Sequence, residues 1–125
     1  MTKTEFTEML HALAAAWARR DYAAAADFFD EDVRYADPLR YEFASRSDLR
    51  AFYEHDEGFE QSTVWHNILF DETQQLGVAE YTYDGTWCYH GTVWIRMQDG
   101  LITHWREYQH ADPREWDDFV SGTAF

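Results

Sequence analysis

The spacing of apolar residues changes once along the chain, from a helical period in the first half to a two-residue period in the second. Within residues 4–20 the apolar side chains recur every three or four positions, which predicts a helix. Thr2 and Glu5 have the spacing of a capping box at the start of that helix. A short second helix is predicted for residues 22–29, with Asp21 as its N-cap and three acidic residues ending it.

A short strand and a third helix are predicted next. Residues 33–37 alternate apolar and polar side chains, which favours a strand just before the first proline. Helical spacing returns at residues 46–57, where Ser45 and Asp48 again have the spacing of a capping box. Gly58 is typical of the residue that follows the end of a helix.

After the third helix the period is two. Four strand-like runs are expected, at residues 63–70, 77–83, 86–97 and 101–109. The dipeptides Asp84-Gly85 and Asp99-Gly100 separate consecutive runs and are strong hairpin signals. Asp112 as an N-cap and Pro113 at the first helical position predict a short C-terminal helix. Helices followed by an antiparallel meander indicate the α+β class.

Length and composition limit what this chain does. Its 125 residues are expected to form a single domain, spanning 1–125, and 18% aromatic residues supply ample apolar area for a core. Twenty-four acidic against ten basic side chains give a formal net charge of −14. Such a surface repels phosphate backbones and anionic lipids, so no nucleic acid and no membrane is expected among the partners.

The sequence also predicts a cytoplasmic protein. No apolar run approaches the roughly 20 residues that cross a bilayer. The first residues have neither the charged lead nor the apolar core of a signal peptide. Cys88 is the one cysteine of the sequence, so no intrachain disulfide forms, and it is interpreted as a small apolar strand residue.

The order of these elements, together with several local stretches, resembles a known superfamily. The stretches are Trp17-Ala18-Arg19-Arg20-Asp21-Tyr22, Phe28-Phe29-Asp30-Glu31-Asp32-Val33, Asp37-Pro38, Leu49-Arg50-Ala51-Phe52-Tyr53 and Asp99-Gly100-Leu101-Ile102-Thr103-His104-Trp105-Arg106-Glu107-Tyr108. They are similar to the nuclear transport factor 2-like superfamily, and more narrowly to its SnoaL-like and ketosteroid isomerase-like branch. The resemblance implies a cystatin-like cone, in which N-terminal helices pack on a curved antiparallel sheet and enclose a cavity. It also implies a homodimer formed through the sheets.

Asp37 is the first candidate for chemistry. The resemblance implies that it matches the aspartate that acts as a general base in ketosteroid isomerase-like proteins. An apolar cavity raises the pKa of such a carboxyl and suits it to proton transfer near neutral pH. Tyr35 shares the parity of Asp37 on the strand and is expected to face the same side. In the alternative interpretation, Asp37 accepts hydrogen bonds from nearby backbone amides, as aspartates in turns do.

The chain departs from two familiar activities of the superfamily. The oxyanion-hole tyrosine and the second acid of the isomerases fall near Leu13 and Val93, which cannot donate a hydrogen bond to an enolate. The arginine and central aspartate of the limonene epoxide hydrolases fall on a strand whose inward positions are Gly91, Val93 and Ile95. Ketosteroid isomerisation and epoxide hydrolysis by those mechanisms are therefore disfavoured.

Glu107 is the second candidate. The resemblance places one parity of its strand inward, namely Thr103, Trp105, Glu107 and Gln109. In the limonene epoxide hydrolase branch an acid at this position holds a water, with groups that resemble Tyr35 and Asp37. Two carboxylates and a phenol in one cavity can form a general acid and base pair. Alternatively, Glu107 simply forms an ion pair with Arg96 or Arg106.

Histidine supplies the third candidate. Residues 63–67 resemble scytalone dehydratase and SnoaL-like proteins, in which a strand histidine faces the pocket, so His66 is expected to shuttle a proton alongside Asp37. In the alternative interpretation His66 is structural, and the glycine after His90 leaves the facing of that residue open. No motif with metal-ligand spacing and no cofactor fingerprint occurs, so no metal and no cofactor are expected.

Aromatic residues form the largest candidate set. Those expected to face inward from strands and helices are Trp17, Phe29, Phe52, Tyr53, Tyr81, Tyr83, Trp87, Tyr89 and Trp105. Large rings with polar tips favour a lined cavity that orients a flat or hydrophobic ligand, and the alternative is an ordinary core. Trp94 and Tyr108 have the outward parity and are expected at a dimer interface.

These observations predict a protein that binds a small hydrophobic or aromatic molecule. If it is an enzyme, cofactor-free isomerisation, dehydration or cyclisation is expected. Asp37 is then the base, and Tyr35, His66 or Glu107 donates or positions a proton. The alternatives are a non-catalytic ligand-binding module and a dimeric assembly domain whose interior is only packed core.

Overall fold

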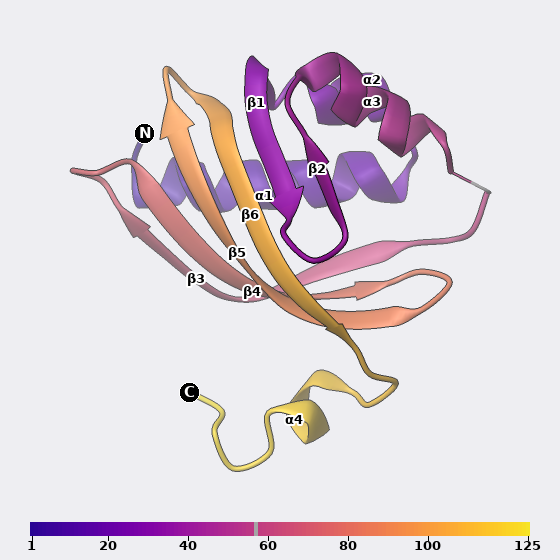
Figure 1. Ribbon diagram of the computed structural model, residues 1–125. Coiled ribbons are helices and arrows are strands. Elements are labelled where there is room, and N and C mark those ends of the chain that lie inside the picture. Colours follow the sequence, from indigo (N-terminus) through magenta and orange to yellow (C-terminus); the bar gives the residue numbers. More distant parts are fainter. Residues whose placement is uncertain (57) are drawn as a thin grey trace.

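The computed structural model describes residues 1–56 and 58–125. Its elements in chain order are α1 (Lys3–Ala18), α2 (Tyr22–Ala26), β1 (Phe29–Asp37), β2 (Tyr41–Phe43), α3 (Arg46–Glu54), β3 (Ser62–Asp71), β4 (Leu76–Asp84), β5 (Cys88–Gln98), β6 (Leu101–Ala111) and α4 (Trp116–Phe119). In Figure 1, α1 lies behind a curved sheet, and α2 and α3 lie together beside β1 and β2. The predicted α+β class is confirmed.

The sheet has six strands in the order β2-β1-β6-β5-β4-β3. The parallel pair is β1 with β6, and the other four pairs are antiparallel. β6 therefore lies inside the sheet, between β1 and β5, although it is the last strand in the sequence. This position makes β6 the strand that receives side chains from both halves of the chain.

Side-chain caps fix the starts of the first three helices. The Thr2 hydroxyl accepts a hydrogen bond from the Glu5 N–H at 3.2 Å, and Ser45 Oγ accepts one from Asp48 at 3.1 Å. Asp21 Oδ1 accepts from the N–H of the third residue of α2 at 3.1 Å. These three predicted caps are confirmed, and each satisfies an N–H that has no partner within its helix.

One face of α1 is buried against the sheet. Phe6, Leu10 and Leu13 are fully buried in the core. The indole N–H of Trp65 on β3 donates to the Leu10 carbonyl at 2.9 Å, which ties the helix to the sheet. Gly77 on β4 lies beneath Phe6, where an added Cβ would come within 2.3 Å of the ring. The close approach of α1 to β4 therefore depends on a residue without a side chain.

The start of the first strand differs from the prediction. The predicted second helix extends to Phe29, but α2 ends at Ala26, and Phe29 begins β1. The three acidic residues expected to end the helix lie in that strand. Pairing explains the difference, because the Ile102 N–H of β6 donates to the Phe28 carbonyl at 2.9 Å. This contact joins residues far apart in the sequence.

Two helix ends also differ from the prediction. α3 ends at Glu54 instead of continuing to residue 57, which itself lies outside the described residues. α4 begins at Trp116 with Glu115 in the N-cap position, so the predicted cap at Asp112 is wrong. Asp112 Oδ1 instead accepts from the Arg114 N–H at 2.9 Å, which forms a local turn before the helix.

A bulge changes the facing of one residue in β6. Ile102 is fully buried although its parity predicted an outward position, and Thr103 is half-buried although it was expected inward. The register shifts between Arg96 and Met97 on the partner strand, opposite the extra residue Thr103. A bulge reverses the alternation of a strand. Trp105 and the inward residues after it keep their predicted facing.

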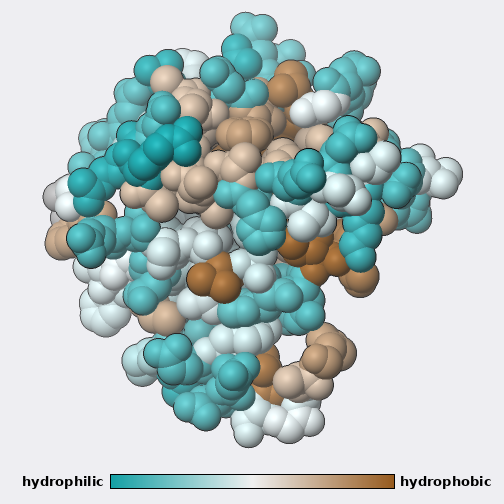
Figure 2. All heavy atoms as spheres, turned by 180° about the vertical axis from the view of Figure 1, so that it is seen from behind, coloured by the Kyte–Doolittle hydropathy of each residue, from teal (hydrophilic) through white to brown (hydrophobic). Residues whose placement is uncertain are grey.

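Hydrophilic side chains cover most of the side of the molecule seen in Figure 2, and apolar ones gather there in separate groups. Both hairpin signals lie where consecutive strands join, as predicted, although Asp84 is itself the last residue of β4. Asp99 and Gly100 have positive φ angles of 52° and 79°. These angles suit the tight turn that joins antiparallel strands.

Within the described ranges, no helix is long and apolar enough to span a bilayer.

Candidate functional site

A pocket of about 520 Å³ lies between the helices and the sheet, and most of its lining side chains are aromatic. Seven of the aromatic residues predicted to contact a ligand line it, namely Trp17, Phe52, Tyr53, Tyr81, Tyr83, Tyr89 and Trp105. Trp87 does not line it, because that side chain lies in the β4–β5 turn and is 68% exposed. Phe29 is part of the fully buried core.

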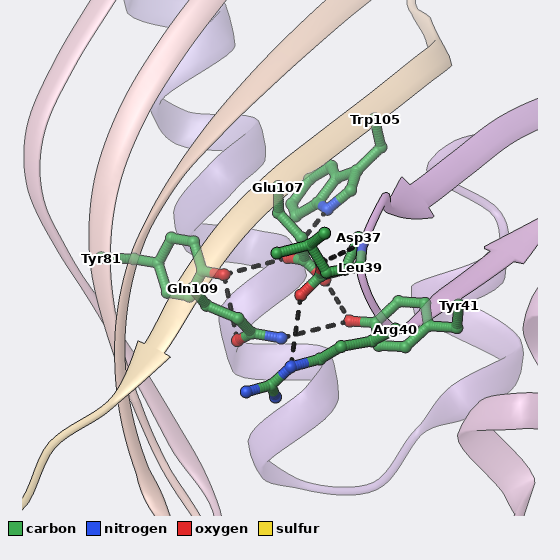
Figure 3. Close-up of polar contacts among 8 residues, drawn as sticks. All are labelled: Asp37, Leu39, Arg40, Tyr41, Tyr81, Trp105, Glu107 and Gln109. Carbon is green, nitrogen blue, oxygen red and sulfur yellow. Dashed lines mark hydrogen bonds and ion pairs between the residues drawn. The ribbon is translucent and has the colours of Figure 1, made fainter.

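Glu107 is the buried acid of this pocket. Its side chain extends from β6, forms part of the pocket lining and is 5% exposed. The Tyr41 hydroxyl donates to Oε1, and the Tyr81 hydroxyl and the Trp105 indole N–H each donate to Oε2 at 3.1 Å (Figure 3). Three neutral donors from three strands therefore converge on one carboxyl.

The ion pair considered as an alternative for Glu107 is absent among the described residues. Arg96 donates to the Gln74 carbonyl at 3.4 Å. Arg106 lies over the ring of its neighbour Tyr108. Both arginines are exposed on the face opposite to the pocket, as the alternation of β5 and β6 requires. That alternative is wrong, and the partners of Glu107 are phenols and an indole.

Strand order explains how Tyr41 and Tyr81 reach the same acid. Tyr41 on β2 reaches across β1, and Tyr81 on β4 reaches across β5, so the two phenols approach Glu107 from opposite sides. Tyr81 pairs with Gly91, and Gly91 pairs with Gln109 on β6. An added Cβ on Gly91 would lie 2.8 Å from the Tyr81 hydroxyl, so the phenol occupies the place of the missing side chain.

Tyr41 is a site residue that the sequence reasoning missed. The prediction placed no strand between the first proline and the third helix, whereas β2 occupies Tyr41–Phe43 there. The alternation of Tyr41, Glu42 and Phe43 after an Asp-Pro turn is a short strand signal, although three residues are too few to predict a strand with the period alone. Pairing with β1 stabilises this short edge strand.

Burial controls the protonation of this cluster. Burial raises the pKa of Glu107 above the ordinary value of a glutamic acid. The hydrogen bonds from the three donors oppose this rise, and the negative charge of Asp37 increases it. Burial also raises the pKa of Tyr41 and of Tyr81, and the Glu107 charge adds to both shifts. The phenols are therefore neutral hydrogen-bond donors at physiological pH.

Gln109 gives the cluster a second hydrogen-bond arrangement. Its Oε1 lies 3.2 Å from the Tyr81 hydroxyl, and its Nε2 donates to the Tyr41 oxygen at 3.3 Å. When Glu107 is ionised, Tyr81 donates to the carboxylate. When Glu107 carries a proton, it can donate to the Tyr81 oxygen while that hydroxyl turns to Gln109. Both states of the acid are thus satisfied without moving the backbone.

Asp37 is buried at 3% exposure but is not among the residues that line the pocket. Its Oδ1 accepts from the Leu39 N–H at 3.1 Å, and its Oδ2 lies 3.6 Å from Arg40 Nε. The backbone hydrogen bond of the alternative interpretation is therefore present, and Asp37 shapes the β1–β2 turn (Figure 3). Tyr35 does line the pocket and stacks on Trp105 with ring centres 5.3 Å apart.

His66 lies on the other face of the sheet, against α4. Its ring stacks on Trp116 with centroids 4.0 Å apart, and Nε2 lies 2.7 Å from Thr82 Oγ1. Thr82 Oγ1 lies 2.8 Å from Nδ1 of His90, whose Nε2 lies 2.7 Å from the Arg114 carbonyl oxygen. A carbonyl accepts only, so His90 Nε2 carries a hydrogen and donates it to the Arg114 carbonyl.

The structure thus brings Glu107 and Tyr35 together at the pocket and leaves His66 apart from them. In the described part of the chain, no group of three or more His, Cys, Asp or Glu side chains is placed to hold a metal ion. Glu107, the phenols and Gln109 can accept, donate and relay protons. This donor and acceptor set is suited to acid–base chemistry on a bound organic molecule.

Comparisons with solved structures show the fold. An LEH-like epoxide hydrolase from M. tuberculosis is similar over 86% of this chain and 84% of that chain, with TM-score 0.74 and 18% identity. An NTF-2 like protein from Burkholderia xenovorans is similar over 94% and 91%, with TM-score 0.75 and 22% identity. A protein with a cystatin-like fold from Methylobium petroleophilum is similar over 93% and 82%, with TM-score 0.76 and 13% identity.

These likenesses confirm the predicted cystatin-like and nuclear transport factor 2-like fold, and at such identities they show the fold alone. A comparison with curated proteins finds no match. The model of the SnoaL-like domain matches residues 10–105, which span α1 to the middle of β6 and include most of the pocket wall. The chain therefore belongs to the SnoaL-like domain family.

Proposed function

We propose that the pocket binds a small, largely apolar or aromatic molecule and that Glu107 exchanges a proton with it. The observation that carries this proposal is one buried carboxyl on an aromatic pocket wall, held by three neutral donors. The rings supply apolar area for binding, and the buried acid supplies a group that can accept and return a proton.

The geometry leaves Glu107 free to act on a bound molecule. Oε1 accepts one hydrogen bond, from Tyr41, while a carboxylate oxygen can accept two. A raised pKa brings the acid closer to neutral pH, where a proton is both taken and returned efficiently. Isomerisation, dehydration and cyclisation each remove one proton from the substrate and add one elsewhere. Tyr35, on the same wall, is proposed to orient the substrate.

Asp37 and His66 have weaker support as direct participants. Asp37 holds the β1–β2 turn and influences Glu107 through its charge. His66 lies on the far face of the sheet, against Trp116. We therefore assign the proton exchange to Glu107 and the positioning of Tyr41 to the turn that Asp37 organises.

A non-catalytic binding module is the second candidate function. It is favoured by Leu13 and Val93, which are fully buried apolar residues at the positions of the isomerases' oxyanion donors. Without donors there, the pocket provides less stabilisation for a developing enolate. In this case Glu107 and the phenols serve only to orient the ligand.

Hydrogen exchange in D2O separates these two candidates. The probe is 2-tetralone, a small aromatic ketone with acidic C–H groups next to its carbonyl. For an enzyme, we expect wild-type protein to accelerate deuterium incorporation, and Glu107→Gln to reduce that rate by about 100-fold or more. Glu31→Gln, which removes one exposed negative charge outside the pocket lining, is the matched control and is expected to keep the rate. Binding detected by protein NMR without accelerated exchange identifies a binding module, and the absence of both contradicts the proposal.

The homodimer remains a proposal as well. Trp94 and Tyr108 are 42% and 48% exposed on the outward face of β5 and β6. Large amphipathic rings on a sheet face are enriched where proteins associate. Sedimentation at several concentrations measures the assembly, and a strictly monomeric chain contradicts the dimer.

A further inference from the structure

The charges around the pocket leave one negative group without a counterion. Arg40 is the arginine of the pocket lining, and its Nε faces Asp37 Oδ2 at 3.6 Å. Asp56, also in the lining, lies 3.3 Å from Arg20 Nε. Within the described residues, the ion pairs of the chain do not include Glu107. When Glu107 ionises, its buried charge is therefore met by hydrogen bonds alone.

A buried charge is costly unless a proton or an opposite charge neutralises it. A proton can neutralise Glu107, and the raised pKa of the acid favours this protonated form. A positively charged group on the ligand can neutralise the carboxylate instead. No lysine competes with such a ligand group for Glu107, because the pocket lining contains no lysine in the part of the chain that the structure describes.

The walls of the pocket are suited to an organic cation. Tyr and Trp rings attract positive charge at their faces. The pocket already contains one example at its rim, where the Arg40 guanidinium lies over the Tyr89 ring at 4.7 Å. In the pocket lining, Tyr35 and Trp105 stack on each other, Trp105 contacts Glu107 through its indole N–H, and burial keeps the Tyr35 phenol neutral. A positive centre there would meet rings and a carboxylate together.

The whole chain favours the same kind of ligand. A formal net charge of −14 gives the molecule a negative field that attracts cations and repels anions. The field by itself is not selective, because screening by salt weakens it beyond about 10 Å. It raises the local concentration of a cationic ligand at the pocket entrance, and contact with Glu107 then supplies the selectivity.

We propose that the ligand of this pocket is a small organic cation, such as a protonated tertiary amine or a quaternary ammonium with apolar substituents, that neutralises Glu107. This inference rests on the proposed function and names the ligand class for the same site. A bound cation also keeps Glu107 in its ionised form, which is the form that accepts a proton from the substrate.

The test compares choline with 3,3-dimethylbutan-1-ol by isothermal titration calorimetry. The two compounds have the same shape, and a carbon in the alcohol replaces the charged nitrogen of choline. We expect choline to bind at least about 10-fold more tightly to wild-type protein at about pH 8. We expect Glu107→Gln to abolish this preference while leaving the affinity for the alcohol unchanged.

Glu31→Gln is the matched control, because it removes one exposed negative charge that is not part of the pocket lining. It is expected to keep the preference for choline. A second measurement serves if Glu107→Gln does not fold: choline affinity of wild-type protein should fall as the pH is lowered and Glu107 takes up a proton, while the affinity for the alcohol stays constant.

Equal affinities for the two compounds overturn the cation inference and leave the proposed function intact. Failure of both compounds to bind also overturns the inference. Whether the pocket binds neutral molecules is then decided separately by 2-tetralone. A preference for choline that survives in Glu107→Gln, or that Glu31→Gln removes, would show a general charge effect and would also contradict the inference.

Discussion

The phenol of Tyr81 occupies the space above Gly91, and this relationship connects β4 to the acid on β6. A Cβ on Gly91 would lie 2.8 Å from the end of the Tyr81 ring and 2.8 Å from the Tyr108 carbonyl oxygen. Any side chain at this position would push the phenol away from Glu107. Gly91 is therefore a positioning residue for the hydrogen-bond cluster of the pocket, although it has no polar side chain.

The first prediction concerns this close approach. Gly91→Ala is expected to lower the free energy of unfolding by about 1–3 kcal/mol, the range found when atoms are inserted into a packed interior. Urea denaturation measures the change. A double-mutant cycle with Tyr81→Leu isolates the contribution of the ring, and the cost of the alanine should be smaller in that background. Additive effects of the two changes would argue against the positioning role of Gly91.

The second prediction concerns pH. The folded-state pKa of Glu107 is raised above its unfolded value of about 4.5 by burial. Its stabilising contribution is therefore complete below about pH 4.5 and is lost as the pH rises through the folded-state pKa. Glu107→Gln cannot ionise, so its stability relative to wild type should increase over that interval.

Urea denaturation of both proteins at several pH values measures this difference. Glu31→Gln is the control for the loss of one negative charge, because Glu31 is exposed on β1. It should follow the wild-type pH profile. If the difference between Glu107→Gln and wild type is independent of pH, the buried acid does not titrate as the structure indicates.

The third prediction concerns the packing of α4 on the sheet. Burial and the neighbouring His90 lower the pKa of His66, while Glu80 and Asp117 oppose the shift. Trp116→Ala removes the ring stacked on His66 and should bring its pKa back toward the ordinary value of 6.5. Trp116→Phe keeps a flat ring and should retain most of the lowering. NMR titration of the histidine ring measures both pKa values.

The same shift has a consequence for stability. A histidine with a lowered folded-state pKa costs stability as the pH falls below about 6.5, because only the unfolded chain readily takes up the proton. Trp116→Ala should therefore lose less stability between neutral and acidic pH than wild type does. A pKa of His66 that is the same in wild type and Trp116→Ala would show that the ring of Trp116 does not bury it.

Local patterns in the sequence were sufficient for the elements that depend on local contacts. The capping residues Thr2, Asp21 and Ser45 were predicted correctly because an N-cap bonds to an N–H only three residues away. The hairpin between β5 and β6 was predicted from Asp99-Gly100 for the same reason. The alternation of the long strands also identified which aromatic side chains share a face.

Pairing between distant segments decided the features that the prediction missed. β2 exists because it pairs with β1, and the β6 bulge shifts Ile102 into the core, where it meets the start of β1. His66 could not be assigned to a face from its strand alone, because β3 has a register shift next to it. None of these contacts leaves a periodic signal in the sequence.

By itself, the sequence determined the α+β class, the helix starts, the hairpins and the abundance of aromatic rings, because each follows from contacts within a few residues or from composition. Only the tertiary structure decided that Tyr41, Tyr81 and Trp105 converge on Glu107, and that Trp87 and His66 lie away from the pocket. The physical reason is that β6 inserts between β1 and β5, so strand order across the sheet selects the partners of Glu107.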